Sequence, residues 1–204
     1  SDLYKEIPFV RMDRDSKYFH QYEGINVRRF RAYTLGGELH YVLMPSMIMP
    51  FLKYRCDIIH AHSYGYFHVN LAALKRILSP NVRFVFTPHF HPVWSMWGGE
   101  KRRKIRRIYD RFIAHYVLES ADAIVGVSKH EIGYLKELYP IEDYKIHIIP
   151  NGIDTSLYNP IPSPKPFLDR YKIDKEGYKI VLYVGRLASN KGLHVLVKAA
   201  NIIV

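Results

Sequence analysis

"VRFVFTPH", residues 82–89, is the stretch that decides the fold of this chain. Apart from Arg83, the run up to Thr87 is apolar, β-branched or aromatic, and it stops at Pro88 and His89. A near-continuous apolar run of this length is typical of a strand in a parallel sheet. Three further runs have the same character, and we expect strands there as well: "DIIHAH" (57–62), "AIVGVS" (123–128) and "KIHIIPNG" (145–152).

Longer amphipathic runs separate these strands. Apolar residues recur at helical spacing over 66–78, 99–118 and 129–139, which predicts a helix in each connection. Upstream, "GINVRRFRA" (24–32) predicts a strand, and 38–54 predicts a helix interrupted by Pro45 and Pro50. Strands that alternate with helices indicate the α/β class, with a parallel sheet that helices cover on both faces.

A proline-rich segment divides the chain. "SLYNPIPSPKP" (156–166) holds four prolines in eleven residues, which is typical of an extended linker. After it, "YKIVLYVGRL" (178–187) and the helical pattern that follows restart the strand–helix alternation. We therefore predict a Rossmann-like first domain over 1–154 that lacks its first strand–helix units, a linker over 155–178, and the first strand and helix of a second domain over 179–204. On this prediction the chain is a fragment that is cut at both ends.

Charge and cysteine content indicate the partners and the compartment. The formal net charge is +11, which favours anionic partners such as phosphates or an acidic membrane surface. Cys56 is the single cysteine and cannot form an internal disulfide, which fits a reducing compartment, so we expect a cytoplasmic protein. No apolar run approaches the roughly 20 residues that span a bilayer.

Polar and glycine residues gather where the predicted strands end. In open parallel sheets ligands bind outside the carboxyl ends of the strands, where helix N-termini also point. The residues at these ends are His60, His62, Thr87, His89, Ser128, Asn151, Gly152, Asp154, Gly185 and Arg186. They predict a ligand crevice along one edge of the sheet.

"YVGRLASNKG" (183–192) places Arg186 and Lys191 around a turn between a predicted strand and a predicted helix. Two cations beside a helix N-terminus suit a diphosphate, because backbone N–H groups and the helix dipole add partial positive charge. The alternative is a solvated helix start with two surface cations. Neither a Walker A loop nor a G-x-G-x-x-G sequence occurs in the chain.

The same stretch carries a resemblance to a known family. "VGRLASNKGLHVLVKAA" (184–200) resembles the opening of the second domain in retaining glycosyltransferases of the GT-B fold, family GT4. "IIPNGIDTSLYNP" (148–160) is similar to that family's crossover between domains, and "ESADAIVGVSKHEIGYL" (119–135) to one of its strand–helix units. "DIIHAHS" (57–63) and "VFTPHFHP" (85–92) match two more of its strand ends. These motifs follow the family's order along the chain.

The resemblance implies roles for several of these residues. Gly185, Arg186 and Lys191 would bind the diphosphate of a nucleotide-sugar donor, a UDP-, GDP- or ADP-hexose, with no other cofactor. His89 would act as the catalytic histidine beside the transferred sugar, and Ser128, Asn151 and Gly152 are candidates for lining the cleft. The implied reaction moves a hexosyl group to a hydroxyl of a carbohydrate or lipid-linked acceptor, with retention of configuration and without a bound metal.

Two departures from the family pattern bear on activity. The family's glycine-rich loop after its first strand is missing, and so is its E-x(7)-E segment, since no glutamate follows Glu176. Because these parts contact donor and acceptor, we expect the 204-residue chain by itself to have little or no transferase activity, although the parent protein would be an enzyme.

A basic segment follows the second of the matched strand ends. "WSMWGGEKRRKIRRIYDRFIAHY" (94–116) has seven cations among residues 101–111, and they are preceded by Trp94 and Trp97. One interpretation is a core-packed helix with a solvated basic face. The other is contact with anionic lipid on the inner face of the cell membrane, through residues that share an aromatic or basic side chain: Trp94, Trp97, Lys101, Arg102, Arg103 and Arg106.

Other classes of function remain as alternatives. A non-catalytic basic module for membrane surfaces or nucleic acid fits the charge, but no nucleic-acid-binding motif is visible, so we expect no nucleic-acid partner. A metallohydrolase would use the histidine pairs His60-x-His62 and His89-x-His91. We expect the rings of each pair to diverge, and neither H-x-H-x-D-H nor H-E-x-x-H accompanies them.

Overall fold

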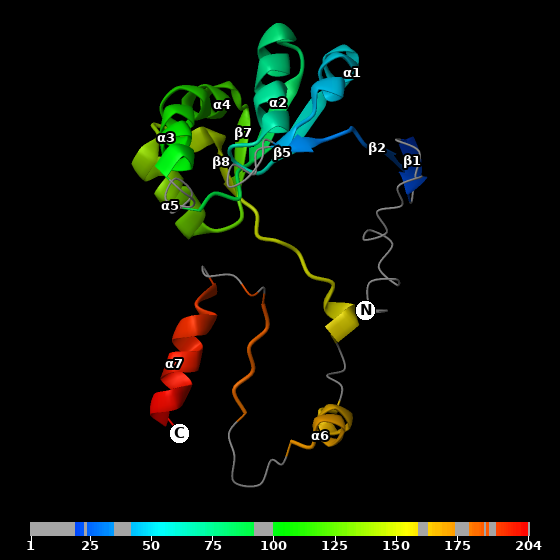
Figure 1. Ribbon diagram of the computed structural model, residues 1–204. Helices are drawn as coiled ribbons and strands as arrows, with labels where there is room; N and C mark the ends of the chain where they lie inside the picture. Colours follow the sequence, from blue (N-terminus) through cyan, green and yellow to red (C-terminus); the bar gives the residue numbers. More distant parts are fainter. Residues whose placement is uncertain are drawn as a thin grey trace. The chain divides into compact units, whose positions relative to one another are not determined.

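The computed structural model describes residues 19–22, 24–34, 42–91, 100–158, 163–173, 180–185, 187 and 191–203 (Figure 1). The chain divides into two compact units, Ser1–Gly152 and Ile153–Val204, and each is described by itself. This division does not decide the predicted domain bounds, which stay a prediction.

The centre of the first unit is a four-stranded parallel sheet in the part of the chain that the structure describes (Figure 1). Its strands are β5 (Ile58–His62), β6 (Arg83–Thr87), β7 (Ala123–Gly126) and β8 (Ile146–Ile148), and they lie side by side in chain order. The parallel sheet and its four strands confirm the expectation from the apolar runs. The strands are shorter than the runs because their ends turn into loops.

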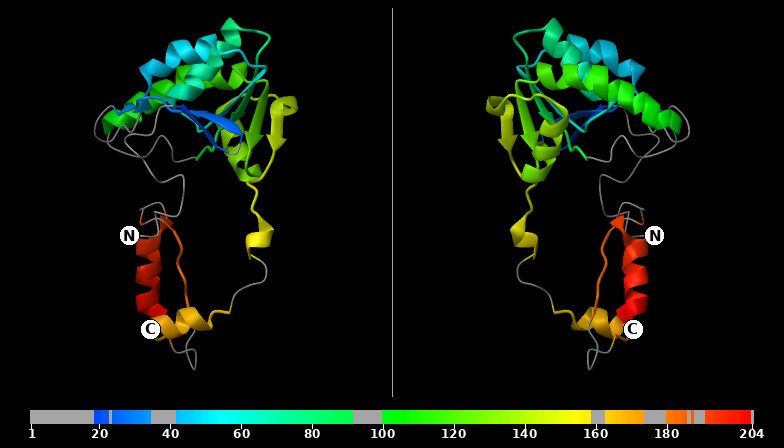
Figure 2. Two further views of the ribbon diagram at one scale, coloured as in Figure 1. Left: turned by 90° about the vertical axis from the view of Figure 1, so that its right-hand side faces the viewer. Right: turned by 90° about the vertical axis from the view of Figure 1, so that its left-hand side faces the viewer.

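Helices make each crossover between these strands. The helix α2 (Phe67–Leu78) joins β5 to β6, and α5 (Lys129–Leu138) follows β7. Between β6 and β7 the chain forms α3 (Glu100–Ile108), a π-helical stretch (Tyr109–Ala114) and α4 (His115–Ser120). A short 3-10 helix, Asp143–Lys145, precedes β8. Both views in Figure 2 show α2 and the α3–α4 segment gathered beside one another.

One face of the sheet is fully buried. The register pairs Ile59 with Phe84 and Ala61 with Phe86, and Phe86 with Ile124, so these side chains share a face. They form one core with residues of α2, α4 and α5. Gly126 lies on the same face, where a Cβ atom would come within 2.3 Å of the Ile132 side chain, so glycine allows α5 to approach β7 closely.

The opposite face is only partly covered by the residues that the structure describes. It carries Ile58, which is 63% exposed, together with the exposed His60 and His62 and the half-buried Val85 and Val125. The expectation of coverage on both faces therefore stays a prediction for this second face. The four strands are added to the sheet one after another in the same direction, from β5 to β8. Right-handed crossovers between strands in such an order place all their helices on the same face, which explains the asymmetry.

The segment before the sheet differs from its prediction. The strand β2 (Ile25–Arg28) pairs antiparallel with β1 (Phe19–Tyr22), so this part of the predicted strand over 24–32 belongs to a hairpin. The short strands β3 (Tyr33–Thr34) and β4 (Val42–Leu43) form a second antiparallel pair.

The helix predicted over 38–54 begins only at a 3-10 turn, Pro45–Met47, and continues as α1 (Ile48–Lys53). Proline lacks an N–H and disfavours helical conformation in the residue before it, so Pro45 starts the helical segment instead of interrupting it.

A buried lysine links α1 to α2. Lys75 on α2 is only 2% exposed. Its ammonium group donates hydrogen bonds to the carbonyl oxygens of Phe51, at 2.8 Å, and Tyr54 at the end of α1. It also lies 5.1 Å from the centre of the Phe51 ring. Carbonyls at a helix C-terminus attract cations, which explains why the core tolerates this charge.

The second unit contains helices but no strand among its described residues. It has a 3-10 helix (Thr155–Tyr158), α6 (Lys165–Tyr171) and α7 (Leu193–Ile203). The predicted linker over 155–178 therefore contains a helix, because prolines in a first turn are compatible with helical conformation. The predicted strand is not formed over 180–184, where no described residue supplies a hydrogen-bond ladder. None of the described helices is long and apolar enough to span a bilayer.

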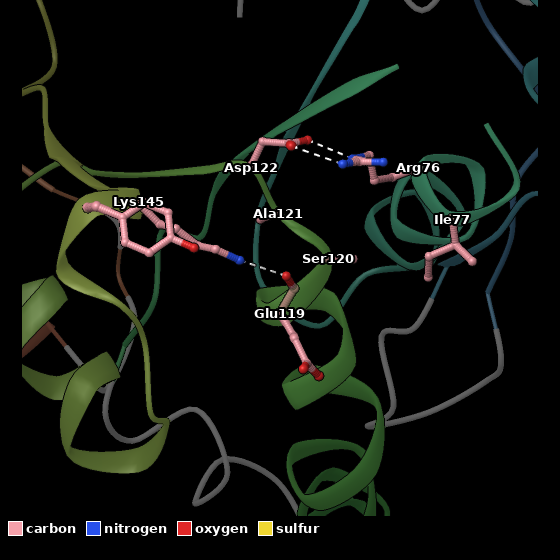
Figure 3. Close-up of a pocket in the computed structure, with 8 residues that line it drawn as sticks. Arg76, Ile77, Glu119, Ser120, Ala121, Asp122 and Lys145 are labelled. Atoms are coloured by element: carbon pink, nitrogen blue, oxygen red, sulfur yellow. Dashed lines mark hydrogen bonds and ion pairs between the residues drawn. The ribbon is translucent and has the colours of Figure 1, made fainter. Parts of the chain in front are cut away.

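Asp122 anchors the edge of the sheet where β6 and β7 begin (Figure 3). Its carboxylate accepts hydrogen bonds from Arg76 Nε at 2.7 Å, from Arg83 Nη1 at 3.0 Å and from the backbone N–H of Phe84 at 2.8 Å. Burial acts to raise the pKa of Asp122, but the donors outweigh it and hold the pKa at about 2. The carboxylate lines a pocket of about 380 Å³, together with Arg76 and Lys145.

We expect Asp122→Asn to lower the free energy of unfolding by about 1–2 kcal/mol at neutral pH, because an amide replaces a charged acceptor that serves two arginines and a backbone N–H. The folded-state pKa lies below the ordinary value of 3.8, so this stabilisation is complete above that value and is lost as the pH falls toward about 2. Urea unfolding across this range should show the difference between the two proteins shrinking. Asp143→Asn, at an exposed ion pair with Lys136, is the control and should change little. A difference independent of pH would contradict the assignment.

Candidate functional site

The loops that leave β5 and β6 are tied together at the carboxyl edge of the sheet. His62 and Thr87 are register partners at the ends of these strands. Beyond them, the backbone N–H of Ser63 donates to the Thr87 carbonyl at 2.9 Å, and that of Tyr64 donates to the Pro88 carbonyl at 2.6 Å. The strand pairing thus continues into the loops and fixes the start of each.

Three histidines and a threonine meet at this edge. His60 Nε2 lies 2.8 Å from Thr87 Oγ1, and His62 Nδ1 lies 3.1 Å from His89 Nε2. The ring centres of His60 and His62 are 4.3 Å apart. The expectation that these two rings diverge is wrong, because positions two apart on a strand face the same side.

The His89 backbone adopts a conformation that side chains rarely take. Its φ is +48°, and Ser63 in the neighbouring loop has a φ of +77°. Non-glycine residues adopt such values where the surroundings hold them there, often at functional sites. Here the hydrogen bonds on both sides of His89 supply that restraint.

Glu131 supplies the restraint on the far side of His89. This carboxylate on α5 is buried, and its two oxygens accept the backbone N–H groups of Phe90 and Val127, each at 2.7 Å. It therefore connects the loop after β6 to the loop after β7. Each oxygen of the buried charge has a donor, which satisfies its hydrogen-bonding capacity.

Ser128 caps the helix that carries Glu131. Its Oγ accepts the N–H of Glu131 at 3.1 Å, and its backbone is extended, as is typical of an N-cap. Ser128, predicted as a candidate for lining the cleft, thus has a hydroxyl engaged in capping. Sequence reasoning missed Glu131, although serine followed three residues later by glutamate is a capping-box signal at a helix start.

A polar cluster is buried behind this edge. Tyr64 Oη donates to Asp110 Oδ1 at 2.7 Å and lies 2.5 Å from Tyr139 Oη. Burial, with the neighbouring Tyr139 and Asp110, raises the pKa of Tyr64, and burial raises that of Tyr139 to about 12. Both phenols therefore stay protonated and serve as donors. Asp110 lies in the π-helical stretch, the local widening that brings it to Tyr64.

The environment of His62 favours its neutral form. Burial lowers its pKa, and the neighbouring rings of His60, His89 and His68 lower it further. His68 Nε2 also lies 2.7 Å from the His62 carbonyl oxygen and donates to it. Within the described residues, no group of three or more histidine, cysteine, aspartate or glutamate side chains has a geometry that could hold a metal ion.

The predicted diphosphate residues belong to the second unit. At Gly185 a Cβ atom would lie 2.9 Å from the Tyr183 hydroxyl, so the backbone runs close to that ring. Lys191 is exposed one residue before Gly192, whose φ is +68° and which precedes α7. Arg186 lies outside the described residues. Asn151 and Gly152 are exposed at the end of the first unit.

The basic segment presents only part of the predicted membrane set. Lys101 and Arg103 are exposed on α3, but Arg106 is only 7% exposed, so it is not one of the exposed cations. Trp94, Trp97 and the side chain of Arg102 lie outside the described part. Apolar side chains of the same segment are exposed instead of core-packed: Ile105, Ile108, Phe112 and Tyr116.

Comparison with known proteins gives a consistent match. The family model described as Glycosyltransferase Family 4 matches residues 8–157. The alpha-maltose-1-phosphate synthase of Mycolicibacterium smegmatis is 28% identical over 147 residues, which are 71% of this chain and 37% of that protein. The mannosylfructose-phosphate synthase of Agrobacterium fabrum is 28% identical over 57% of this chain and 28% of its own length.

A D-inositol 3-phosphate glycosyltransferase of Nocardiopsis dassonvillei is 26% identical over 71% of this chain and 32% of its own length. The chain thus spans about a third of the length of the curated relatives it matches. Among solved structures, a glycosyltransferase from Rickettsia africae superposes with a TM-score of 0.55 at 21% identity, over 86% of this chain and 43% of that one. The fold is the Rossmann-like α/β fold of the GT-B type.

We expect Glu131→Gln to lower the free energy of unfolding by about 1.5–3 kcal/mol, because one backbone N–H loses its charged acceptor and faces an amide nitrogen. Hydrogen exchange at the amides of Phe90 and Val127 should accelerate more than elsewhere in the sheet. Glu137→Gln, at an exposed position on the same helix, should leave both measurements unchanged. Unaltered exchange at Phe90 in the Glu131 variant would contradict this role.

Proposed function

Because the chain belongs to Glycosyltransferase Family 4, we propose that it forms the acceptor side of an enzyme that moves a hexosyl group from a nucleotide-diphosphate sugar to a hydroxyl group, with retention of configuration. The observation that supports this most directly is the position of His89. It lies at the carboxyl edge of a parallel sheet, where such folds bind ligands, in a loop that hydrogen bonds fix on both sides.

In the proposed reaction, the bond between the anomeric carbon and the diphosphate oxygen breaks, and the nucleoside diphosphate leaves with the electron pair. The acceptor oxygen bonds to the same carbon and gives up its proton. The His89 ring would hydrogen bond to the transferred sugar as oxocarbenium-like charge develops. Arg186 and Lys191 would neutralise the departing diphosphate, assisted by the N-terminus of α7.

The named relatives suggest which acceptors to test. Two are synthases of phosphorylated sugars and one is a glycosyltransferase of an inositol phosphate. An acceptor series should therefore contain free sugars, sugar phosphates, inositol phosphates and lipid-linked sugars.

The reaction is tested by incubating the full-length protein with α-linked UDP-, GDP- and ADP-hexoses and this acceptor series. We expect one donor and one acceptor to yield an α-linked product, which NMR identifies from the anomeric coupling. Changing both Arg186 and Lys191 to alanine should weaken the binding of the matching nucleoside diphosphate at least about tenfold, since each charge-assisted hydrogen bond contributes about 1.5–3 kcal/mol.

The matched control for the double variant is Lys198→Ala, which removes an exposed cation of α7 farther along the helix. Calorimetry should give this control the affinity of the unchanged protein. A β-linked product would contradict retention. An unchanged nucleotide affinity in the double variant would remove the two cations from the donor site.

We further propose that the basic segment contacts an anionic membrane surface on the cytoplasmic side. The exposure of its apolar side chains favours this over a core-packed helix, since Phe112 is 64% exposed and lies beside the exposed Arg111. Exposed apolar rings among cations are what interfacial helices present to acidic lipid headgroups. The net charge of +11 acts in the same direction.

We expect the protein to sediment with phosphatidylserine-containing vesicles, less at high salt, and hardly at all with neutral vesicles. Changing both Ile105 and Phe112 to glutamate should reduce vesicle binding at least about tenfold, because two apolar insertions are lost. Tyr144→Glu is the control, since Tyr144 is exposed on another segment. Equal sedimentation with neutral and acidic vesicles would contradict the proposal.

A further inference from the structure

His62 is the residue whose contacts the proposed reaction leaves unexplained. It is not part of the Thr87-Pro88-His89 motif that ends β6. Its ring is nevertheless the hydrogen-bond partner of His89, which lies 27 residues farther along the chain. The contact joins His62 Nδ1 to His89 Nε2 at 3.1 Å, and the two rings are nearly parallel, with an interplanar angle of 21°.

A hydrogen bond between two imidazoles constrains the protons of both rings. One nitrogen must carry the proton and the other must accept it, so the tautomer of one ring determines the tautomer of the other. If both rings were fully protonated, two N–H groups would face each other, which a separation of 3.1 Å does not allow. The intact contact is therefore compatible with at most one positive charge on the two rings.

His62 is itself held more firmly than an exposed histidine on a loop. It is the last residue of β5, and its carbonyl oxygen accepts the hydrogen bond from His68 Nε2. The ring of His60 lies against its own ring, and His60 is fixed in turn by Thr87. The titratable groups that face His62 are thus His60 on its own strand, His68 on α2 and His89 after β6.

The pairing also decides which atom of His89 is available. His62 occupies Nε2 of His89, whereas Nδ1 of His89 has no hydrogen bond to another described residue. Because Glu131 fixes the next backbone N–H, at Phe90, the ring is restrained at its backbone and at Nε2.

We propose that His62 is a positioning residue that fixes the ring and the tautomer of His89, so that Nδ1 of His89 is the nitrogen that meets the substrate. This role rests on the proposed function, in which His89 is the catalytic histidine. At a pH that protonates the pair once, the added proton makes both nitrogens of one ring donors without breaking the contact. At a pH low enough to force a second proton onto the pair, the contact opens and His89 loses its fixed orientation.

The test combines NMR with kinetics on the full-length protein. In protein labelled with ¹⁵N-histidine, two-bond proton–nitrogen correlations report the tautomer of each ring. We expect a single tautomer for His89 in the unchanged protein. In His62→Phe, which keeps a ring without nitrogen, His89 should become a mixture of tautomers.

The kinetic arm separates positioning from structure. We expect His62→Phe to lower kcat about 100-fold with little change in the donor KM, as is typical of a misplaced catalytic group. His62→Asn should restore part of kcat, because its amide can engage His89 Nε2. His147→Phe, at an exposed histidine of β8, is the matched control and should change neither the tautomer of His89 nor kcat.

Each result decides one point. A His89 tautomer that is unchanged in His62→Phe overturns the positioning role, as does an unchanged kcat in that variant. If the unchanged protein transfers no sugar from any donor, the proposed function fails instead. The tautomer measurement needs no substrate, so in that case it still shows whether His62 fixes His89.

Discussion

The carboxylate of Glu131 is the constraint on which the rest of the site depends. The chain leaves β6 through a proline and then a residue with positive φ, a path that provides few backbone hydrogen bonds of its own. Glu131 accepts the N–H that follows this turn and the N–H that follows β7, so one buried side chain sets the separation of two loops. Without it the strand end would still form, but the backbone after His89 would lose its hydrogen bond to α5.

Charge is distributed so that buried groups are paired and exposed groups are mostly cationic. Asp122 has two arginines and a backbone donor, Lys75 has two carbonyls, and Glu131 has two amides. An unpaired charge in these positions would cost several kcal/mol, whereas the exposed cations remain solvated at little cost. The formal charge of +11 favours anionic partners such as phosphates or acidic lipids.

The strands of the sheet could be predicted from the sequence because buried strands require runs of apolar residues, such as 82–89. The polar residues at the strand ends could be predicted as well, because parallel strands share one carboxyl edge. What the sequence did not reveal depends on long-range geometry. The pairing of His62 with His89 needs the end of β5 to meet the loop after β6. The path of 180–184 depends on partners for its backbone rather than on its own apolar character. The π-helical stretch at Tyr109–Ala114 likewise takes part in a long-range contact, the hydrogen bond that Tyr64 donates to Asp110.

The asymmetry of the sheet explains why histidines can gather at one place on it. Crossovers that lie on one face bury Phe84, Phe86 and Ile124, and they leave the alternate positions of β5 facing a region with less apolar packing. An imidazole at such a position keeps enough solvent contact to titrate, yet its neighbours depress protonation, as the lowered pKa of His62 indicates. Histidine is the side chain that can share a single proton with a second ring, and this edge of the sheet places that ring within hydrogen-bonding distance.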